Sequence, residues 1–267
     1  MKRQAYILIT VVALIAAVVL PARPALAIIG GEFDGNAHPY VGALDLRPIF
    51  GPGDPIPCTG TLISPTVFLT AGHCTAFFDQ AGLTEARVTF DPDMLSANAR
   101  FYTGSVHTNP LFTHSQDDPG DLGVIVFSKP VKRITPASLP TAGLLDQLGP
   151  QGLRTVVFTM VGYGVTRLLG GSSGGGPPGV DPFSAGTRMV ATMTFLSLTD
   201  AWLSVSMLDD GRGCIGDSGA PLLPGDTDLV VAVGVRGDGA CEATGRALRL
   251  DTPTARAFLG QFVESAP

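Results

Sequence analysis

Short apolar runs, each closed by turn-forming residues, recur along most of the chain. The runs at 59–63, 67–70 and 124–127 are bounded by residues such as glycine, serine and proline. Such runs are typical of β-strands, whereas helices need longer segments with a period of 3.6 residues. We expect further strands at 38–44, 156–161, 189–195, 203–207, 229–235 and 247–250. The short, turn-rich connections favour antiparallel sheets, so we predict an all-β fold.

One helix is expected close to the C-terminus. Thr252 precedes Pro253, which places a hydroxyl N-cap before proline at the first helical position. The apolar residues that follow at helical spacing are Phe258, Leu259, Phe262 and Val263. We expect this stripe to pack the helix onto the sheets, with no direct role in function.

The first 27 residues have a different pattern. Two basic residues follow the initial methionine, an apolar run occupies 6–20, and Pro21 ends it. Small residues at 25 and 27 complete the pattern of a secretory signal peptide, which we assign to 1–27. A membrane anchor is the alternative, but a run of this length is short for a span.

Cleavage after Ala27 would leave a chain that begins at Ile28, whereas a cut after Ala22 would leave 23–27 as a short pro-segment. The first 27 residues contain three basic and no acidic residues, so 14 basic and 23 acidic residues would remain, a net charge of −9. This balance excludes nucleic acid as a main partner. No later segment is apolar and long enough to cross a membrane, so we expect no membrane association after signal removal.

Composition agrees with the predicted strands. The chain has 34 glycines, 22 prolines and only 15% charged residues, as expected for many short strands and turns. Four cysteines in an exported chain predict two disulfides, for which three pairings exist. A zinc site is the competing interpretation, but the sequence has neither a C-x-x-C motif nor paired histidines.

Three segments carry candidate chemistry. Residues 213–221 read GCIGDSGAP and place Ser218 between glycines, which permit a tight backbone and close approach of a ligand. Alone, such a motif more often marks a surface turn. Upstream, His73 ends an apolar run beside a cysteine, and Asp121 leads directly into the apolar strand at 123–127. A base and an orienting carboxylate are what a serine hydroxyl needs to become a nucleophile.

In this order and setting, the three segments resemble the trypsin/chymotrypsin-like serine peptidases, and the resemblance covers nearly everything after residue 27. It implies two six-stranded antiparallel β-barrels with the active site between them. We therefore expect an N-terminal barrel at 28–140 that carries His73 and Asp121. A C-terminal barrel at 141–267 would carry Ser218 and the helix.

The resemblance also implies the roles of these residues. His73 would take the proton of Ser218, and Asp121 would hold the imidazole in the required tautomer. The amides of Gly216 and Ser218 would form the oxyanion hole. Relatives pair a new N-terminal ammonium with the aspartate before the nucleophile, which here means Ile28 with Asp217. The family pattern also selects one disulfide pairing, Cys58–Cys74 with Cys214–Cys241.

The expected specificity pocket departs from the trypsin pattern. Arg212 occupies the position at the pocket floor, where cleavage after lysine or arginine needs an acidic group. Gly237 and Gly245 would leave the pocket walls open. An arginine at the floor would favour acidic side chains, or it would pair with Asp209 or Asp210.

Further departures lie close to the expected triad. Where relatives have Ser-Trp-Gly, this chain has Val235 and Arg236 before its glycine, so the hydroxyl that often supports the catalytic aspartate is missing. Gly72 replaces an alanine and Ala220 replaces a glycine; both are expected to be tolerated.

Other motifs receive structural interpretations. The glycine-rich segment 170–179 lacks the Lys-Ser/Thr of a P-loop, so we expect a surface loop. His114, Asp117 and Asp118 form either a cation-binding loop or, as we favour, a solvated one. We treat His38 and His107 as structural.

These observations predict a secreted serine endopeptidase that works through an acyl-enzyme, without a cofactor or metal. We expect a protein or peptide as substrate, protein inhibitors as further partners, and a monomer. Two alternatives stay open: a catalytically silent relative that acts as a binding protein, and an esterase that uses the same triad.

Overall fold

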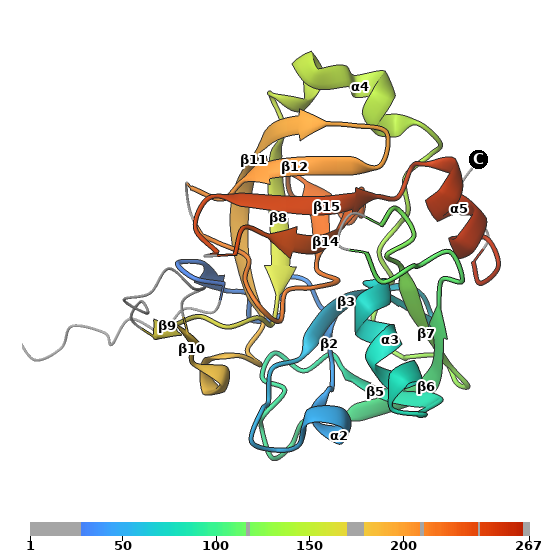
Figure 1. Cartoon of the computed structure of the whole chain (residues 1–267), viewed down its shortest axis with the longest axis vertical. Coiled ribbons are helices and arrows are strands. Elements are labelled where there is room, and N and C mark those ends of the chain that lie inside the picture. Colours follow the sequence, from blue (N-terminus) through green and yellow to red (C-terminus); the bar gives the residue numbers. More distant parts are fainter. Residues whose placement is uncertain (1–27, 116–117, 170–178, 209–210, 240, 264–267) are drawn as a thin grey trace, which may run out of the picture.

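The computed structural model describes residues 28–115, 118–169, 179–208, 211–239 and 241–263. The predicted signal peptide, most of the glycine-rich segment, Asp117, Asp209 and Asp210 lie outside the described residues. Figure 1 shows two barrels stacked one above the other, with few helices around them. No helix in the described ranges combines the length and the apolar character that a membrane span requires.

Six antiparallel strands close the first barrel in the order β2-β3-β4-β7-β6-β5. They are β2 (Val41–Leu44), β3 (Cys58–Ser64), β4 (Val67–Thr70), β5 (Glu85–Thr89), β6 (Phe101–Thr108) and β7 (Gly123–Phe127). Glycines at 42, 60 and 104 lie where a side chain would collide with neighbouring strands; at Gly60, a Cβ would lie 2.3 Å from the Leu69 carbonyl oxygen. The barrel therefore packs tightly because these positions lack side chains.

The second barrel has the strand order β11-β12-β15-β14-β13-β8, and it closes because β8 also pairs with β11. Its strands are β8 (Val157–Gly162), β11 (Met189–Leu198), β12 (Trp202–Ser206), β13 (Pro221–Pro224), β14 (Ala232–Gly237) and β15 (Thr244–Arg249). A short strand, β1 (Glu32–Phe33), adds the N-terminal segment to β11, and β9 (Leu168–Leu169) pairs with β10 (Gly179–Val180). The two predicted six-stranded antiparallel barrels are confirmed.

The predicted C-terminal helix is also confirmed. In α5 (Pro253–Leu259), the Thr252 hydroxyl accepts a hydrogen bond from the Ala255 amide at 3.3 Å, as an N-cap should. Phe258 and Leu259 are buried in the core, where the helix packs against the barrels.

Four other helical segments have no counterpart in the sequence-based expectation. They are α2 (Arg47–Phe50), α3 (Gly72–Gln80), α4 (Leu144–Leu153) and the 3-10 helix η1 (Pro182–Ser184). Within α4, Gly149 has a non-helical backbone before Pro150, so two short turns join across a kink. Such short helices bury too little apolar surface to leave a periodic pattern in the sequence.

A buried arginine joins the two barrels. Arg188, which directly precedes β11, is fully buried and donates from Nε to the Asp34 carboxylate at 2.9 Å. Its Nη1 donates to the carbonyl oxygens of Val41 and Phe90 in the first barrel and to the hydroxyl of Tyr163 in the second. A buried guanidinium is tolerated when its donors are satisfied in this way, so Arg188 fixes the barrels relative to each other.

Candidate active site

His73 lies in the first turn of α3, directly after β4. The Cys58–Cys74 disulfide ties this turn to β3, and Cys214–Cys241 is also formed, so both expected disulfides are present. A Cβ at Gly72 would lie 2.8 Å from the Leu122 amide nitrogen. Glycine at this position, where relatives have alanine, therefore lets α3 approach the chain that carries Asp121.

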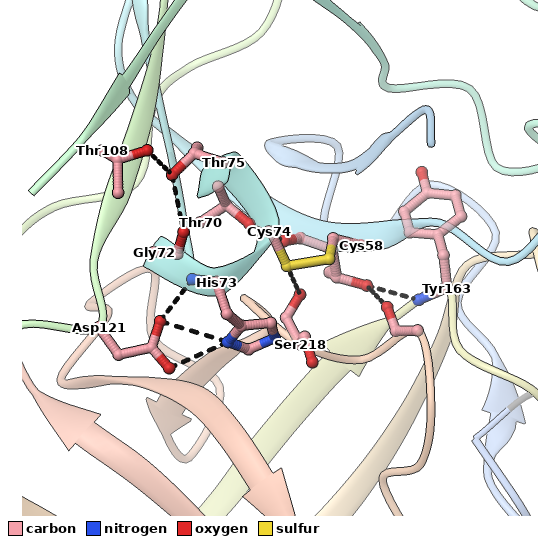
Figure 2. The surroundings of a disulfide bond; sticks show 12 residues. Cys58, Thr70, Gly72, His73, Cys74, Thr75, Thr108, Asp121, Tyr163 and Ser218 are labelled. Carbon is pink, nitrogen blue, oxygen red and sulfur yellow. Dashed lines mark hydrogen bonds and ion pairs between the residues drawn. A yellow bond between two sulfur atoms is a disulfide. The ribbon is translucent and has the colours of Figure 1, made fainter. Parts of the chain in front are cut away.

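The carboxylate of Asp121 holds His73 through both its main chain and its ring. It accepts from the His73 amide at 2.7 Å, and its Oδ2 lies 2.9 Å from ring Nδ1. Asp121 is 3% exposed and lies two residues before β7, which pairs with β4. Because Nδ1 donates to the carboxylate, the neutral ring has its acceptor on Nε2. Figure 2 shows the ring between Asp121 on one side and Ser218 on the other.

Ser218 belongs to the second barrel, but its turn is held by the first. The Thr59 amide donates to the Ser218 carbonyl oxygen at 2.8 Å, and the Thr59 hydroxyl donates to the Gly216 carbonyl oxygen at 2.9 Å. Thr59 is itself fixed, because Thr70 of β4 donates to its carbonyl oxygen at 2.7 Å. β4, which leads into the turn that carries His73, therefore also positions the turn around Ser218.

Ser218 and His73 border the same surface cleft, which also contains Gly216. The Ser218 side chain has no hydrogen-bond partner among the described residues, so its hydroxyl and the His73 ring share the cleft without a direct hydrogen bond. Hydrogen bonds of this kind often tighten only when substrate binds. The arrangement leaves the hydroxyl available for proton transfer.

Two amides beside the serine are without acceptors. In the described part of the chain, the N–H groups of Gly216 and Ser218 donate to no group, whereas the Asp217 and Gly219 amides donate to Cys214 and Gly234. Gly216 has φ +101°, and a Cβ there would lie 2.7 Å from the Gly164 Cα. Glycine therefore permits a turn that leaves two donors available to an anion.

Asp217 is buried without a cationic partner in the described residues. Its carboxylate accepts from the amides of Gly164 and Cys214 at 2.8 and 2.9 Å. Burial raises the pKa of Asp217 to about 6, although these hydrogen bonds oppose the shift. Ile28, its expected partner, is also fully buried and lies against Met189 and Ala191 of β11.

A cavity of about 50 Å³ opens beside Ser218 in the second barrel. Gly237 and Gly245, the two glycines expected at the walls of a specificity pocket, are paired across β14 and β15 and line this cavity. Its apolar lining comes from Met160, Met193, Val205, Met207, Leu222, Val235 and Ala247. Arg236 and Arg246 also border it, and the guanidinium of Arg246 lies 4.6 Å from the ring centre of Trp202.

Arg212 is not among the residues that line this cavity, although the sequence predicts it at the floor. Its main chain pairs with Ile29 through two hydrogen bonds, of 3.1 and 2.9 Å. The next residue, Gly213, lines the cavity instead. Successive residues of an extended backbone face opposite ways. Because Gly213 faces the cavity, the side chain of Arg212 is directed away from it.

Val235 stands in the place of the serine that the family pattern leads us to expect close to Asp121. It is the bulged residue of β14 and borders a depression that also contains His73 and Asp121. Its side chain offers no donor. Among the described residues, Asp121 therefore receives hydrogen bonds from His73 alone.

The remaining histidines have structural contacts. The ring of His38 bonds to the Asp34 carboxylate, a partner that the sequence-based interpretation missed. His107 bonds to the Ser105 hydroxyl at 2.9 Å and packs on Phe262. His38 and Asp34 are four residues apart, and this short spacing in the sequence could have indicated that the two side chains pair.

The loop that contains His114 and Asp118 shows no cation-binding arrangement in its described residues. The Asp118 carboxylate accepts from the Thr113 hydroxyl at 2.6 Å and from the Gly120 amide at 2.7 Å, so it stabilises the loop itself. Elsewhere, the ligand atoms of Cys58, His73 and Cys74 lie within 4.8 Å of one another. Both sulfurs belong to the disulfide, however, and a metal requires free thiolates.

Comparisons with known proteins agree with this geometry. The Trypsin family model matches residues 28–257. CLIP domain-containing serine protease B15 of Anopheles gambiae is 25% identical over 213 residues, which cover 73% of this chain and 57% of that protein. The chain thus spans little more than half the length of this curated relative.

Among solved structures, HL collagenase superimposes with a TM-score of 0.65 at 17% identity, over 88% of this chain and 97% of that one. Likeness at this identity shows the fold alone. The family match, by contrast, covers most of the chain and begins at Ile28. This protein therefore belongs to the trypsin family of serine proteases.

Proposed function

We propose that this protein is a serine endopeptidase in which His73, Asp121 and Ser218 form the catalytic triad. One observation carries the proposal: the Asp121 carboxylate holds His73 at 2.7 and 2.9 Å, and the ring borders the same cleft as Ser218. Each group comes from a different segment, and together they supply the nucleophile, base and orienting anion of acyl transfer.

The proposed reaction has two halves. The Ser218 hydroxyl transfers its proton to His73 Nε2 as Oγ attacks the peptide carbonyl carbon, and the Gly216 and Ser218 amides bind the oxyanion. The imidazolium, stabilised by Asp121, then protonates the leaving amine, which leaves an acyl-enzyme. Water, activated by the same histidine, releases the acyl group and restores Ser218.

We also propose that a free N-terminus at Ile28 completes the site. The buried Asp217 carboxylate needs a cation to offset its desolvation, and an α-ammonium at Ile28 would supply one. The pair would fix the turn at 216–218, which carries both proposed oxyanion donors. Signal-peptide removal after Ala27 would generate this terminus directly, and secretion agrees with the two disulfides.

The cavity beside Ser218 supports specificity for an apolar side chain. Its lining is mostly aliphatic and thioether, and methionine side chains adapt to different apolar shapes. The carboxylate that borders it, Asp217, is buried and bonded to two amides. We therefore propose proteins or peptides with an apolar residue at the cleaved bond as substrates, protein inhibitors as further partners, and a monomer that needs no cofactor.

A peptide library tests this function. The mature protein and its Ser218→Ala variant are incubated with a diverse peptide mixture, and the cuts are mapped by mass spectrometry. We expect cuts after apolar residues that disappear in the variant. Absence of cuts and of Ser218 labelling by an organophosphorus probe would indicate the silent binding protein. Labelling without peptide cleavage would indicate the esterase.

A further inference from the structure

A groove on the first barrel, separate from the proposed active site, collects positive charge. Its volume is about 670 Å³, and it lies between the loop after β5, the start of β6 and the segment after β7. Four of its lining residues are cationic: Arg100, Lys129, Lys132 and Arg133. We call this feature the basic groove.

The four cations of the basic groove are exposed, and in the described part of the chain none of them forms an ion pair. One carboxylate, Asp91, also lines the groove and accepts from the Arg100 main-chain amide, so the lining has four cationic side chains and one anionic side chain. By contrast, Arg47 and Arg87 share Asp45. A chain with 23 acidic and 17 basic residues thus concentrates four cations and one carboxylate in this groove, which leaves it with a positive charge.

The rest of the groove is apolar enough to favour more than a simple anion. Tyr102 and Ile134 are half-buried in its wall, and Pro130 is exposed at its edge. A sulfated sugar chain would use the cations but would leave these surfaces without a partner. An acidic peptide with apolar side chains between its carboxylates would satisfy both.

The groove is far from the triad. β7 begins just after Asp121 and ends just before Lys129, and five strand residues span about 17 Å. A ligand in the groove would therefore leave the cleft at Ser218 open.

We propose that the basic groove binds an acidic, apolar-containing segment of a partner protein. The inference concerns binding alone and does not depend on catalysis. It makes the groove a second recognition surface, which would hold a substrate or an inhibitor by a segment remote from the cleaved bond.

Binding is measured by fluorescence anisotropy with the mature Ser218→Ala protein, which leaves the probe intact. The probe is a labelled peptide of alternating glutamate and phenylalanine, compared with glutamate–serine and lysine–phenylalanine peptides and with a heparin fragment. The groove variant Lys129→Gln/Lys132→Gln removes two charges. The control Arg154→Gln/Arg167→Gln removes two exposed charges from the second barrel.

We expect the glutamate–phenylalanine peptide to bind most tightly and to lose about tenfold in affinity in the groove variant, with little change in the control. Added salt should weaken binding. Preferential binding of the heparin fragment would overturn the proposal in favour of a polysaccharide site. Equal binding of the glutamate–serine peptide, equal loss in both variants, or no binding would also overturn it. Because Ser218 is absent from the assay, failure here leaves the proposed peptidase function unaffected.

Discussion

At the scale of single residues, two buried carboxylates beside the proposed nucleophile, those of Asp121 and Asp217, differ in how their charge is stabilised. Asp121 has its charge satisfied by two groups of His73, whereas Asp217 is equally buried and has main-chain amides as its donors in the described residues. The sequence identified both residues through their motifs. The sequence does not show which groups stabilise each charge, because this depends on which donors the fold places around each carboxylate.

The unpaired state of Asp217 predicts a pH effect on stability. Burial raises the pKa of Asp217 in the folded chain to about 6, above the ordinary aspartate value of about 3.9. Between these values the folded chain binds more protons than the unfolded chain, so the free energy of unfolding rises as the pH falls through this window. For a form that retains 23–27, in which Ile28 has no free amine, the gain from pH 7 to pH 5 is about 1 kcal/mol.

Urea unfolding in the Ser218→Ala background measures this effect. The form that retains 23–27 is compared with the form that begins at Ile28, and Asp217→Asn in the longer form serves as the control for all other carboxylates. The ammonium of Ile28 should hold the pKa of Asp217 lower and abolish the gain. The same pH dependence in both forms would contradict the proposed pairing.

At the scale of elements, apolar runs in the sequence correctly predicted the strands in which nearly every residue is buried. β3, β4 and β7 lie where the sequence predicts them, because their residues are nearly all buried. The sequence did not predict β5 and β6, because polar and apolar residues mix along them and one face of each strand is exposed. β13 starts and ends with proline, which a local pattern disfavours in strands, although its partners β8 and β14 stabilise it.

Motifs in the sequence selected the candidate triad, whereas most residues that line the cavity beside Ser218 belong to no motif. Arg212 occupies the expected place in sequence, but its pairing with Ile29 directs Gly213 toward the cavity instead. The three methionines that line this cavity, Met160, Met193 and Met207, come from β8, from β11 and from the residue directly after β12. No local pattern brings such residues together, because their proximity arises only when the barrel closes.

At the scale of the whole molecule, the proposed catalysis requires the two barrels to keep a fixed position relative to each other. His73 and Asp121 come from one barrel and Ser218 from the other, and Thr59 bridges to the turn of the nucleophile. Arg188, whose buried charge is paired with Asp34, also joins the two barrels through the carbonyl oxygens of Val41 and Phe90. Its loss should therefore affect both stability and the geometry of the site.

Replacement of Arg188 by methionine tests this link. The change leaves the Asp34 carboxylate buried beside His38 alone, and loss of one partner of a buried pair costs about 3–5 kcal/mol. Arg167→Met, which removes an exposed partner of Asp181, should cost less than about 1 kcal/mol. Urea unfolding measures both, and equal small losses would show that Arg188 does not hold the barrels.

Site-selective acylation of Ser218 tests the triad most directly. The mature protein, His73→Ala and Asp121→Asn are treated with an organophosphorus probe, and the modified residue and its rate are determined by mass spectrometry. We predict modification at Ser218 in the parent protein and a rate at least about 1000-fold lower in both variants, with unchanged thermal unfolding. Equal rates in all three proteins, or modification at other serines only, would contradict the claim that His73, oriented by Asp121, activates Ser218.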